Sequence, residues 1–140
     1  MLTTAGSVAL AESIPRGDAT VVAKLRARGA IIIGKANMTE FGNYKGEILW
    51  GWSSRGGQTQ SAYGLGAFPG DVCTGGSSSG SAVGVSAGFA AGAIGTETDG
   101  SIKDSASRAG LYAIKTTVGL VPRGRHYSTF LDCRLSWTVG

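Results

Sequence analysis

The stretch GGSSSGSAVGVSAGFAAGAIGTETDGS, residues 75–101, decides how the rest of the chain is interpreted. It begins with a glycine-serine loop, continues through small residues that predict a helix over Ser81–Ala91, and ends in a polar turn at Ser101. Glycine is unfavourable inside a helix, so a glycine at every fourth position predicts a face that packs very closely on a neighbour: Gly84, Gly88 and Gly92. Such a helix would hold two serine-bearing loops near each other, which is typical of a catalytic site.

The segment upstream of this stretch indicates an α/β unit. Asp18 is predicted to cap a helix over Ala19–Arg28, because a short carboxylate can accept from the first helical N–H groups. Three apolar residues spaced along that helix are predicted to form its inner stripe: Val21, Val22 and Leu25. The β-branched run Ala30–Ile33 is predicted to be a buried parallel strand. Helix followed by strand favours the α/β class.

Composition and charge limit the classes of function. The chain has 140 residues and 24 glycines, with only 16% charged residues, which is enough for one small, loop-rich domain. The 13 basic residues are spread along the sequence, so nucleic-acid binding is not expected. Met1–Leu10 has no signal-peptide pattern, and serines interrupt the uncharged stretch Thr74–Thr96, so no membrane span is expected. Cys73 and Cys133 show neither metal spacing nor a disulfide framework, which predicts a reduced, cytoplasmic protein without metal or cofactor.

Serine chemistry requires a base, and the sequence restricts which base is available. A serine hydroxyl is weak at its free pKa and needs activation. The single histidine is His126, in the C-terminal tail, so a Ser-His-Asp triad built on the central stretch is disfavoured. A lysine kept neutral by burial is the remaining choice. Gly76–Gly80 also fits the G-x-S-x-G nucleophile elbow, but that elbow follows a strand, whereas the turn-rich residues 68–74 precede this one.

Four motifs together resemble the amidase signature family. They are Thr3–Ser7 (TTAGS), Gly34–Phe41 (GKANMTEF), Gly75–Ser78 (GGSS) and Gly95–Ile102 (GTETDGSI). The resemblance extends from about Thr3 to Arg123, so residues 1–123 are interpreted as a core fragment and residues 124–140 as a divergent tail. It implies a partial amidase signature fold, a mixed sheet flanked by helices that is incomplete in this chain.

The resemblance also implies a site and a reaction. Ser101 would attack an amide carbonyl to form an acyl-enzyme, and Ser77, after a cis peptide bond, would relay the proton. The backbone N–H groups of the turn would form the oxyanion hole: Thr98, Asp99 and Gly100, with Ser101. Gly76 and Ser78 would support the serine loop. The substrate would be a small-molecule amide, and the oligomeric state is not predicted.

The family's catalytic lysine lies in a K-D-N-like motif upstream of the TTAGS segment, and no such motif occurs in the 140 residues. Lys35 is predicted to be a surface or loop-anchoring residue. The chain therefore holds two of three catalytic residues, and we expect that it does not hydrolyse amides by itself. The alternative is a truncated, catalytically inactive amidase-like remnant.

Two further segments carry expectations. Gly42–Asp71 reads as a long loop, and its aromatic residues either line a substrate passage or only anchor the loop: Trp50, Trp52 and Tyr63. After Ser101, a short helix is predicted over Ala106–Ala113.

Overall fold

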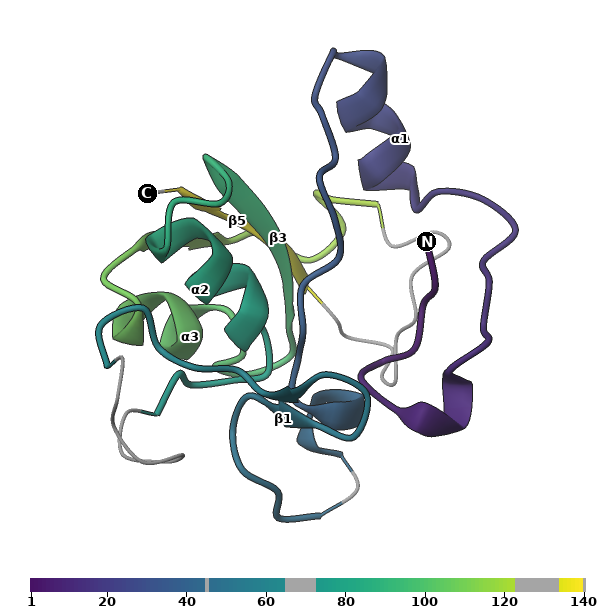
Figure 1. The fold of residues 1–140 in the computed structure, drawn as a ribbon. Coiled ribbons are helices and arrows are strands. Elements are labelled where there is room, and N and C mark those ends of the chain that lie inside the picture. The colour runs from purple at the N-terminus through teal and green to yellow at the C-terminus, as the bar shows by residue number, and fades with distance from the viewer. Residues whose placement is uncertain (45, 65–72, 123–133, 140) are drawn as a thin grey trace.

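The structure, a computed structural model, describes residues 1–44, 46–64, 73–122 and 134–139. Its central sheet has the strand order β3 (Gly92–Glu97), β5 (Arg134–Val139), β4 (Tyr112–Lys115). Because β5 is antiparallel to both neighbours, β3 and β4 run parallel to each other on either side of it. The α2 helix (Ser79–Ser86) and the α3 helix (Lys103–Arg108) lie beside each other against this sheet (Figure 1). The α/β class is confirmed.

A second region carries the N-terminal half of the chain. It contains η1 (Val8–Leu10), α1 (Thr20–Ala27), η2 (Glu40–Asn43) and the hairpin β1 (Trp52–Ser53) with β2 (Gly57–Gln58). An extended segment descends from α1 to η2 (Figure 1), and on it Asn37 O accepts from Gly80 N–H at the start of α2. The helices of the described residues are all too short to cross a membrane.

Helix α2 is shorter than the sequence predicts. It starts at Ser79 rather than Ser81 and ends at Ser86 rather than Ala91. The cause is Gly88, which takes φ +77° and lets its N–H donate to Val85 O at 2.9 Å. Phe89 N–H then donates to Gly84 O at 2.9 Å, which completes a Schellman motif. Glycine tolerates this left-handed conformation, and the helix therefore stops there.

The predicted glycine face is also wrong. Gly88 ends the helix, Gly92 belongs to β3, and a Cβ built on Gly84 would meet no atom of the described chain within 4 Å. Close approach occurs at other glycines. A Cβ on Gly80 would overlap the backbone of Asn37, and one on Gly95 would lie 2.8 Å from Ser78 Oγ.

The helix before the extended segment forms, but the strand after it does not. Asp18 does not cap α1: the cap position is Ala19, and Asp18 Oδ2 instead accepts from Arg26 Nε at 2.9 Å. Of the predicted inner stripe, Val21 is buried and Val22 and Leu25 are half-buried.

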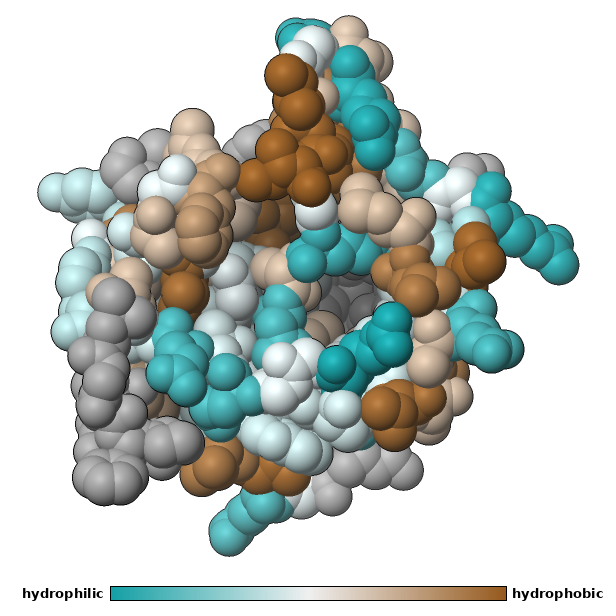
Figure 2. Space-filling model, in the orientation of Figure 1, coloured by the Kyte–Doolittle hydropathy of each residue, from teal (hydrophilic) through white to brown (hydrophobic). Residues whose placement is uncertain are grey.

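Residues 30–33 adopt no strand, and Ile31 and Ile33 are 88% and 68% exposed. A strand requires a hydrogen-bonded neighbour, and no strand of the described chain pairs with this segment. Apolar side chains gather over α1 and the segment that follows it (Figure 2).

The predicted helix over Ala106–Ala113 is displaced toward the N-terminus. Helix α3 spans Lys103–Arg108, and Gly110, at φ +67°, ends it. Tyr112–Lys115 then forms β4. The long loop predicted over Gly42–Asp71 contains the β1–β2 hairpin; residues 45 and 65–71 of it lie outside the described residues.

The interior of the described chain is more polar than apolar. Its buried apolar side chains are small or medium in size and lie mostly in α2, in α3 and at the two ends of α3: Val21, Ala82, Val85, Ile102, Ala106 and Ala109. Five polar side chains of the described residues have an exposed fraction of 1% or less: Thr39, Ser53, Ser79, Glu97 and Ser105. Buried polar groups are costly unless they are hydrogen-bonded, and four of these five side chains are bonded, whereas Ser79 Oγ has no hydrogen-bond partner among the described residues.

Candidate active site

The loop before α2 brings the two sequence-predicted serines together. The Gly76–Ser77 peptide bond is cis, the configuration that the resemblance implied. Immediately after it, Ser78 N–H donates to Ser101 O at 3.1 Å, so the loop carrying Ser77 is joined directly to the turn carrying Ser101. Ser77 is buried and Ser101 is half-buried.

Ser78 and Ser105 fix this junction on two sides. Ser78 Oγ accepts from Thr96 N–H at 3.1 Å and donates to Thr96 O at 3.2 Å, which ties the loop to β3. Ser105 Oγ, on α3, donates to Ser101 O at 3.1 Å. The carbonyl of Ser101 therefore accepts from two elements, and its position relative to α3 and the serine loop is set by both.

The hairpin region supports the serine loop from the other side, through a residue that the sequence analysis did not single out. Thr39 N–H donates to Ser77 O at 3.0 Å, and Thr39 Oγ1 accepts from Gly51 N–H at 2.9 Å. Trp50 packs on the same loop, because a Cβ on Gly76 would come 2.5 Å from its Cε3. Thr39 thus links the hairpin to the serine loop.

Asn37 is a second connecting residue that sequence reasoning missed. Its Oδ1 accepts from Ser53 Oγ at 2.7 Å, and its backbone carbonyl accepts from Gly80 N–H at 3.1 Å, at the start of α2. Its Nδ2 donates, at 3.0 to 3.3 Å, to Gly51 O, Gly57 O and Thr59 Oγ1. The presence of an asparagine in the GKANMTEF motif was the available signal, but its partners are distant in sequence.

The turn after β3 is held by the carboxylate of Glu97, which is fully buried. Glu97 Oε2 accepts from Ile102 N–H at 2.8 Å and from Lys103 N–H at 2.9 Å, and Oε1 accepts from Gly100 N–H at 2.9 Å. Burial alone would raise the pKa of this carboxyl group. The bonds from Lys115 and from the three N–H groups outweigh that effect and lower the pKa to about 2.

Of the four N–H groups predicted to form the oxyanion hole, two are hydrogen-bonded within the turn and two have no acceptor among the described residues. Gly100 N–H is bonded to Glu97, and Ser101 N–H donates to Asp99 O at 2.9 Å. Thr98 N–H and Asp99 N–H have no acceptor within the described ranges, and both residues are exposed. Within the described residues, these two donors have no acceptor and could bond to an oxygen of a substrate.

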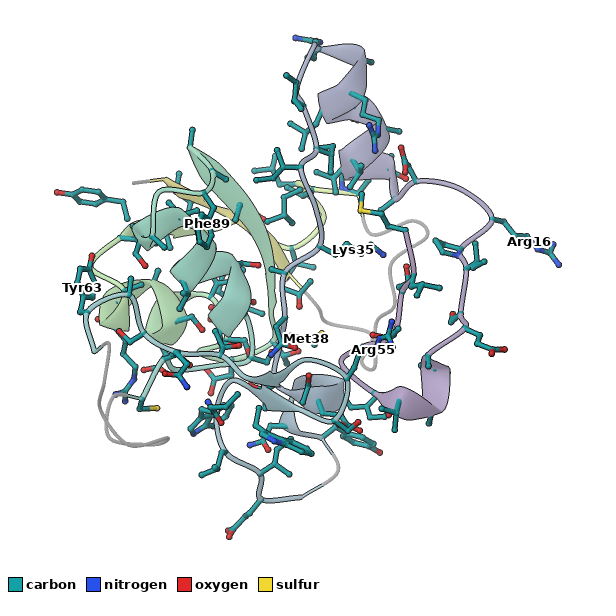
Figure 3. All side chains as sticks on the ribbon, viewed as in Figure 1. Arg16, Lys35, Met38, Arg55, Tyr63 and Phe89 are labelled. Atoms are coloured by element: carbon teal, nitrogen blue, oxygen red, sulfur yellow. The ribbon has the colours of Figure 1, made fainter. Side chains whose placement is uncertain are left out.

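The lysines near the site are engaged elsewhere. Lys115 Nζ lies 2.9 Å and Lys103 Nζ 3.5 Å from Glu97 Oε1. Lys35 projects from the extended segment toward the N-terminal segment, where its Nζ donates to Thr3 Oγ1 (Figure 3). Partial burial lowers the pKa of Lys35, against the attraction of Asp18. In the part of the chain that the structure describes, neither Ser77 Oγ nor Ser101 Oγ has a hydrogen-bond partner.

The loop aromatics have anchoring contacts. Tyr63 OH donates to Ala109 O at 3.0 Å, and the Trp50 carbonyl accepts from Gln58 Nε2 at 2.8 Å. Trp50 and Trp52 are 43% and 36% exposed. A role for these two rings in a substrate passage stays a prediction. His126 and Cys133 lie outside the described residues.

Comparison with known proteins identifies the family of this chain. The Amidase family profile matches residues 1–135. A probable amidase of Arabidopsis thaliana is 48% identical over 122 residues, covering 86% of this chain and 23% of that protein. The native peptide amidase of Stenotrophomonas maltophilia is similar in structure, with a TM-score of 0.80 and 48% identity over 88% of this chain and 24% of that one. An amidase family protein of Bacillus anthracis gives a TM-score of 0.82 at 42% identity, with the same coverage.

The chain therefore belongs to the amidase family, and its structure is an α/β part of the amidase fold. It spans about a quarter of the length of the relatives it matches. The family match continues to residue 135, beyond the Arg123 boundary that the motifs suggested.

Proposed function

We propose that this chain carries the nucleophile-bearing part of an amidase that cleaves a carboxylic amide C–N bond through a serine acyl-enzyme. The observation that supports this most directly is the bond from Ser78 N–H to Ser101 O. It holds the loop with the cis Gly76–Ser77 bond against the turn in which Thr98 N–H and Asp99 N–H have no acceptor among the described residues. Nucleophile, relay and oxyanion donors then occupy one junction, as acyl transfer requires.

The proposed reaction proceeds in two stages. Ser101 Oγ attacks the amide carbonyl while its proton passes through Ser77 Oγ to a neutral lysine, and the carbonyl oxygen becomes an oxyanion at the free N–H groups. Collapse breaks the C–N bond, and the relayed proton leaves on the amine. Water then attacks the acyl-enzyme ester in the same manner and releases the carboxylic acid. The lysine must come from outside these 140 residues, since no K-D-N-like motif occurs among them.

The test is a graft into a related enzyme. Residues 1–122 of this chain replace the matching segment of the Stenotrophomonas maltophilia peptide amidase, which supplies the rest of the amidase fold. We expect the graft to hydrolyse amides and the Ser101→Ala form to lose about 10⁴-fold or more in kcat. Ser107→Ala is the matched control, because Ser107 is exposed on α3 a short distance beyond the nucleophile.

The same experiment separates the competing interpretations. The isolated chain is expected to show no amide turnover, and Ser101-dependent turnover by it would contradict the assignment of an external base. A correctly folded graft whose activity is unaffected by Ser101→Ala would contradict the nucleophile assignment. A folded but inactive graft would favour the inactive remnant.

A further inference from the structure

Two N–H groups of the turn between β3 and α3, those of Thr98 and Asp99, have no acceptor among the described residues. Gly100 N–H is bonded to Glu97 Oε1, and Ser101 N–H to Asp99 O. Of the two remaining, Asp99 N–H belongs to the peptide group whose carbonyl is Thr98 O. A group that donates a hydrogen bond to Thr98 O therefore polarises Asp99 N–H, which is one of these two donors.

Lys115 bonds to that carbonyl. From the end of β4, Lys115 Nζ donates to Thr98 O at 2.9 Å and simultaneously lies 2.9 Å from Glu97 Oε1. Its side chain is only 15% exposed, so water competes weakly for the ammonium group. A hydrogen bond to a peptide carbonyl withdraws electron density from the amide nitrogen, which makes the N–H of the same peptide group a stronger donor.

We propose that Lys115 is a positioning residue that strengthens Asp99 N–H as an oxyanion donor through the Thr98–Asp99 peptide group. The inference rests on the proposed amidase function and adds a role for a residue 14 positions beyond Ser101 in the sequence. Glu97 orients the ammonium group, since it binds the same Nζ while its other contacts fix the turn. Lys115 touches no reacting atom: its effect passes through the peptide group.

Lys103 is a natural control for this proposal. Its Nζ lies 3.5 Å from the same Glu97 oxygen, but its side chain is 58% exposed, and within the described ranges it donates to no carbonyl of the turn. Removing Lys103 takes away a neighbouring positive charge and leaves the Thr98 carbonyl bonded. Comparing the Lys103 and Lys115 variants therefore distinguishes a general loss of positive charge near Glu97 from a specific loss of polarisation at Asp99 N–H.

The first test uses the chain itself and needs no turnover. Amide ¹H and ¹⁵N shifts are recorded for the isotopically labelled chain and its Lys115→Met, Lys115→Arg and Lys103→Met variants. We expect Lys115→Met to move the Asp99 amide upfield more than the Ser101 amide, Lys115→Arg to restore it, and Lys103→Met to leave it near its original position. If Lys115→Met does not fold, Lys115→Leu, which also removes the donor to Thr98 O, gives the same comparison. An Asp99 amide that does not respond to Lys115, or responds equally to Lys103, overturns the proposal.

The second test measures kinetics in the active graft. If Lys115 strengthens one donor by about 10–30%, removing it in Lys115→Met should lower kcat by about two- to fivefold and leave KM unchanged. Lys115→Arg should keep kcat near the original value. A change in KM alone, or no rescue by arginine, overturns the proposal. If the graft never gains activity, the amidase proposal fails, while the Asp99 shift still decides the role of Lys115 on its own.

Discussion

Replacing Glu97 with glutamine tests whether one buried carboxylate holds the turn between β3 and α3. Glu97 Oε1 and Oε2 together accept from three backbone N–H groups and face two ammonium groups. A glutamine side chain has one acceptor oxygen in place of two and places an NH₂ group against donors. At least one buried donor then loses its acceptor, and the Lys115 ammonium group loses its counter-charge.

The pKa gives the size of the effect. A folded-state pKa of about 2, against 4.5 for the free group, means that ionised Glu97 stabilises the folded chain. At about 1.4 kcal/mol per pKa unit, this is on the order of 3 kcal/mol. Because the folded pKa is depressed, the contribution is complete above about pH 5 and is lost as the pH falls from there toward about 2.

The assay is urea unfolding of the wild-type chain and the Glu97→Gln variant at several pH values from 7 to 2. We expect the variant to be less stable by about 3 kcal/mol at pH 7 and the two curves to converge near pH 2. Glu12→Gln is the matched control, since Glu12 is exposed and outside every ion pair of the described chain; it should change stability by less than about 0.5 kcal/mol. Equal stability at pH 7, or parallel curves down to pH 2, would refute the argument.

Two further predictions concern packing around the serine loop. Gly80→Ala should destabilise the chain by about 1–3 kcal/mol in urea unfolding, because its methyl group would overlap the Asn37 backbone, whereas Gly84→Ala in open space on the same helix should stabilise it by about 1 kcal/mol. The reverse order would show that Asn37 does not contact α2. Thr39→Val should cost about 1–3 kcal/mol because Gly51 N–H loses its acceptor, while Thr39→Ser should retain most of the stability; equal losses would mean that the hydroxyl is not the linking group.

The features that the sequence predicted well are local and carried by contiguous motifs. The GGSS loop and the GTETDGS turn each fix their own backbone, and the helix between them limits how far apart they can lie. The junction of Ser78 with Ser101 therefore follows from two short motifs and one helix. The existence of α1, α2 and α3 follows from composition in the same way, although their ends do not.

The features that could not be predicted depend on partners far away in the sequence. Glu97 reads as one residue of a turn motif, yet its role depends on Lys115, which a separate strand positions. Gly88 reads as a member of a spaced glycine set, whereas its positive φ makes it a helix terminator. Thr39 and Asn37 connect the hairpin to the serine loop through bonds that no periodicity encodes.

The failed strand prediction has a different physical cause, and it connects stability to activity. Ile31 and Ile33, like Tyr112 and Ile114 of β4, are more than half exposed, although residues of this kind favour buried sheet. Hydrogen bonds and ion pairs thus hold the candidate site together, whereas these apolar side chains of residues 30–33 and of β4 stay exposed among the described residues. If the proposed function holds, the host in the graft should supply a base for Ser101, and we expect its remaining residues to cover these apolar side chains. Activity and stability should therefore rise together there, and a graft that gained activity while these side chains stayed exposed would show that the serine junction alone is sufficient to hold the catalytic geometry.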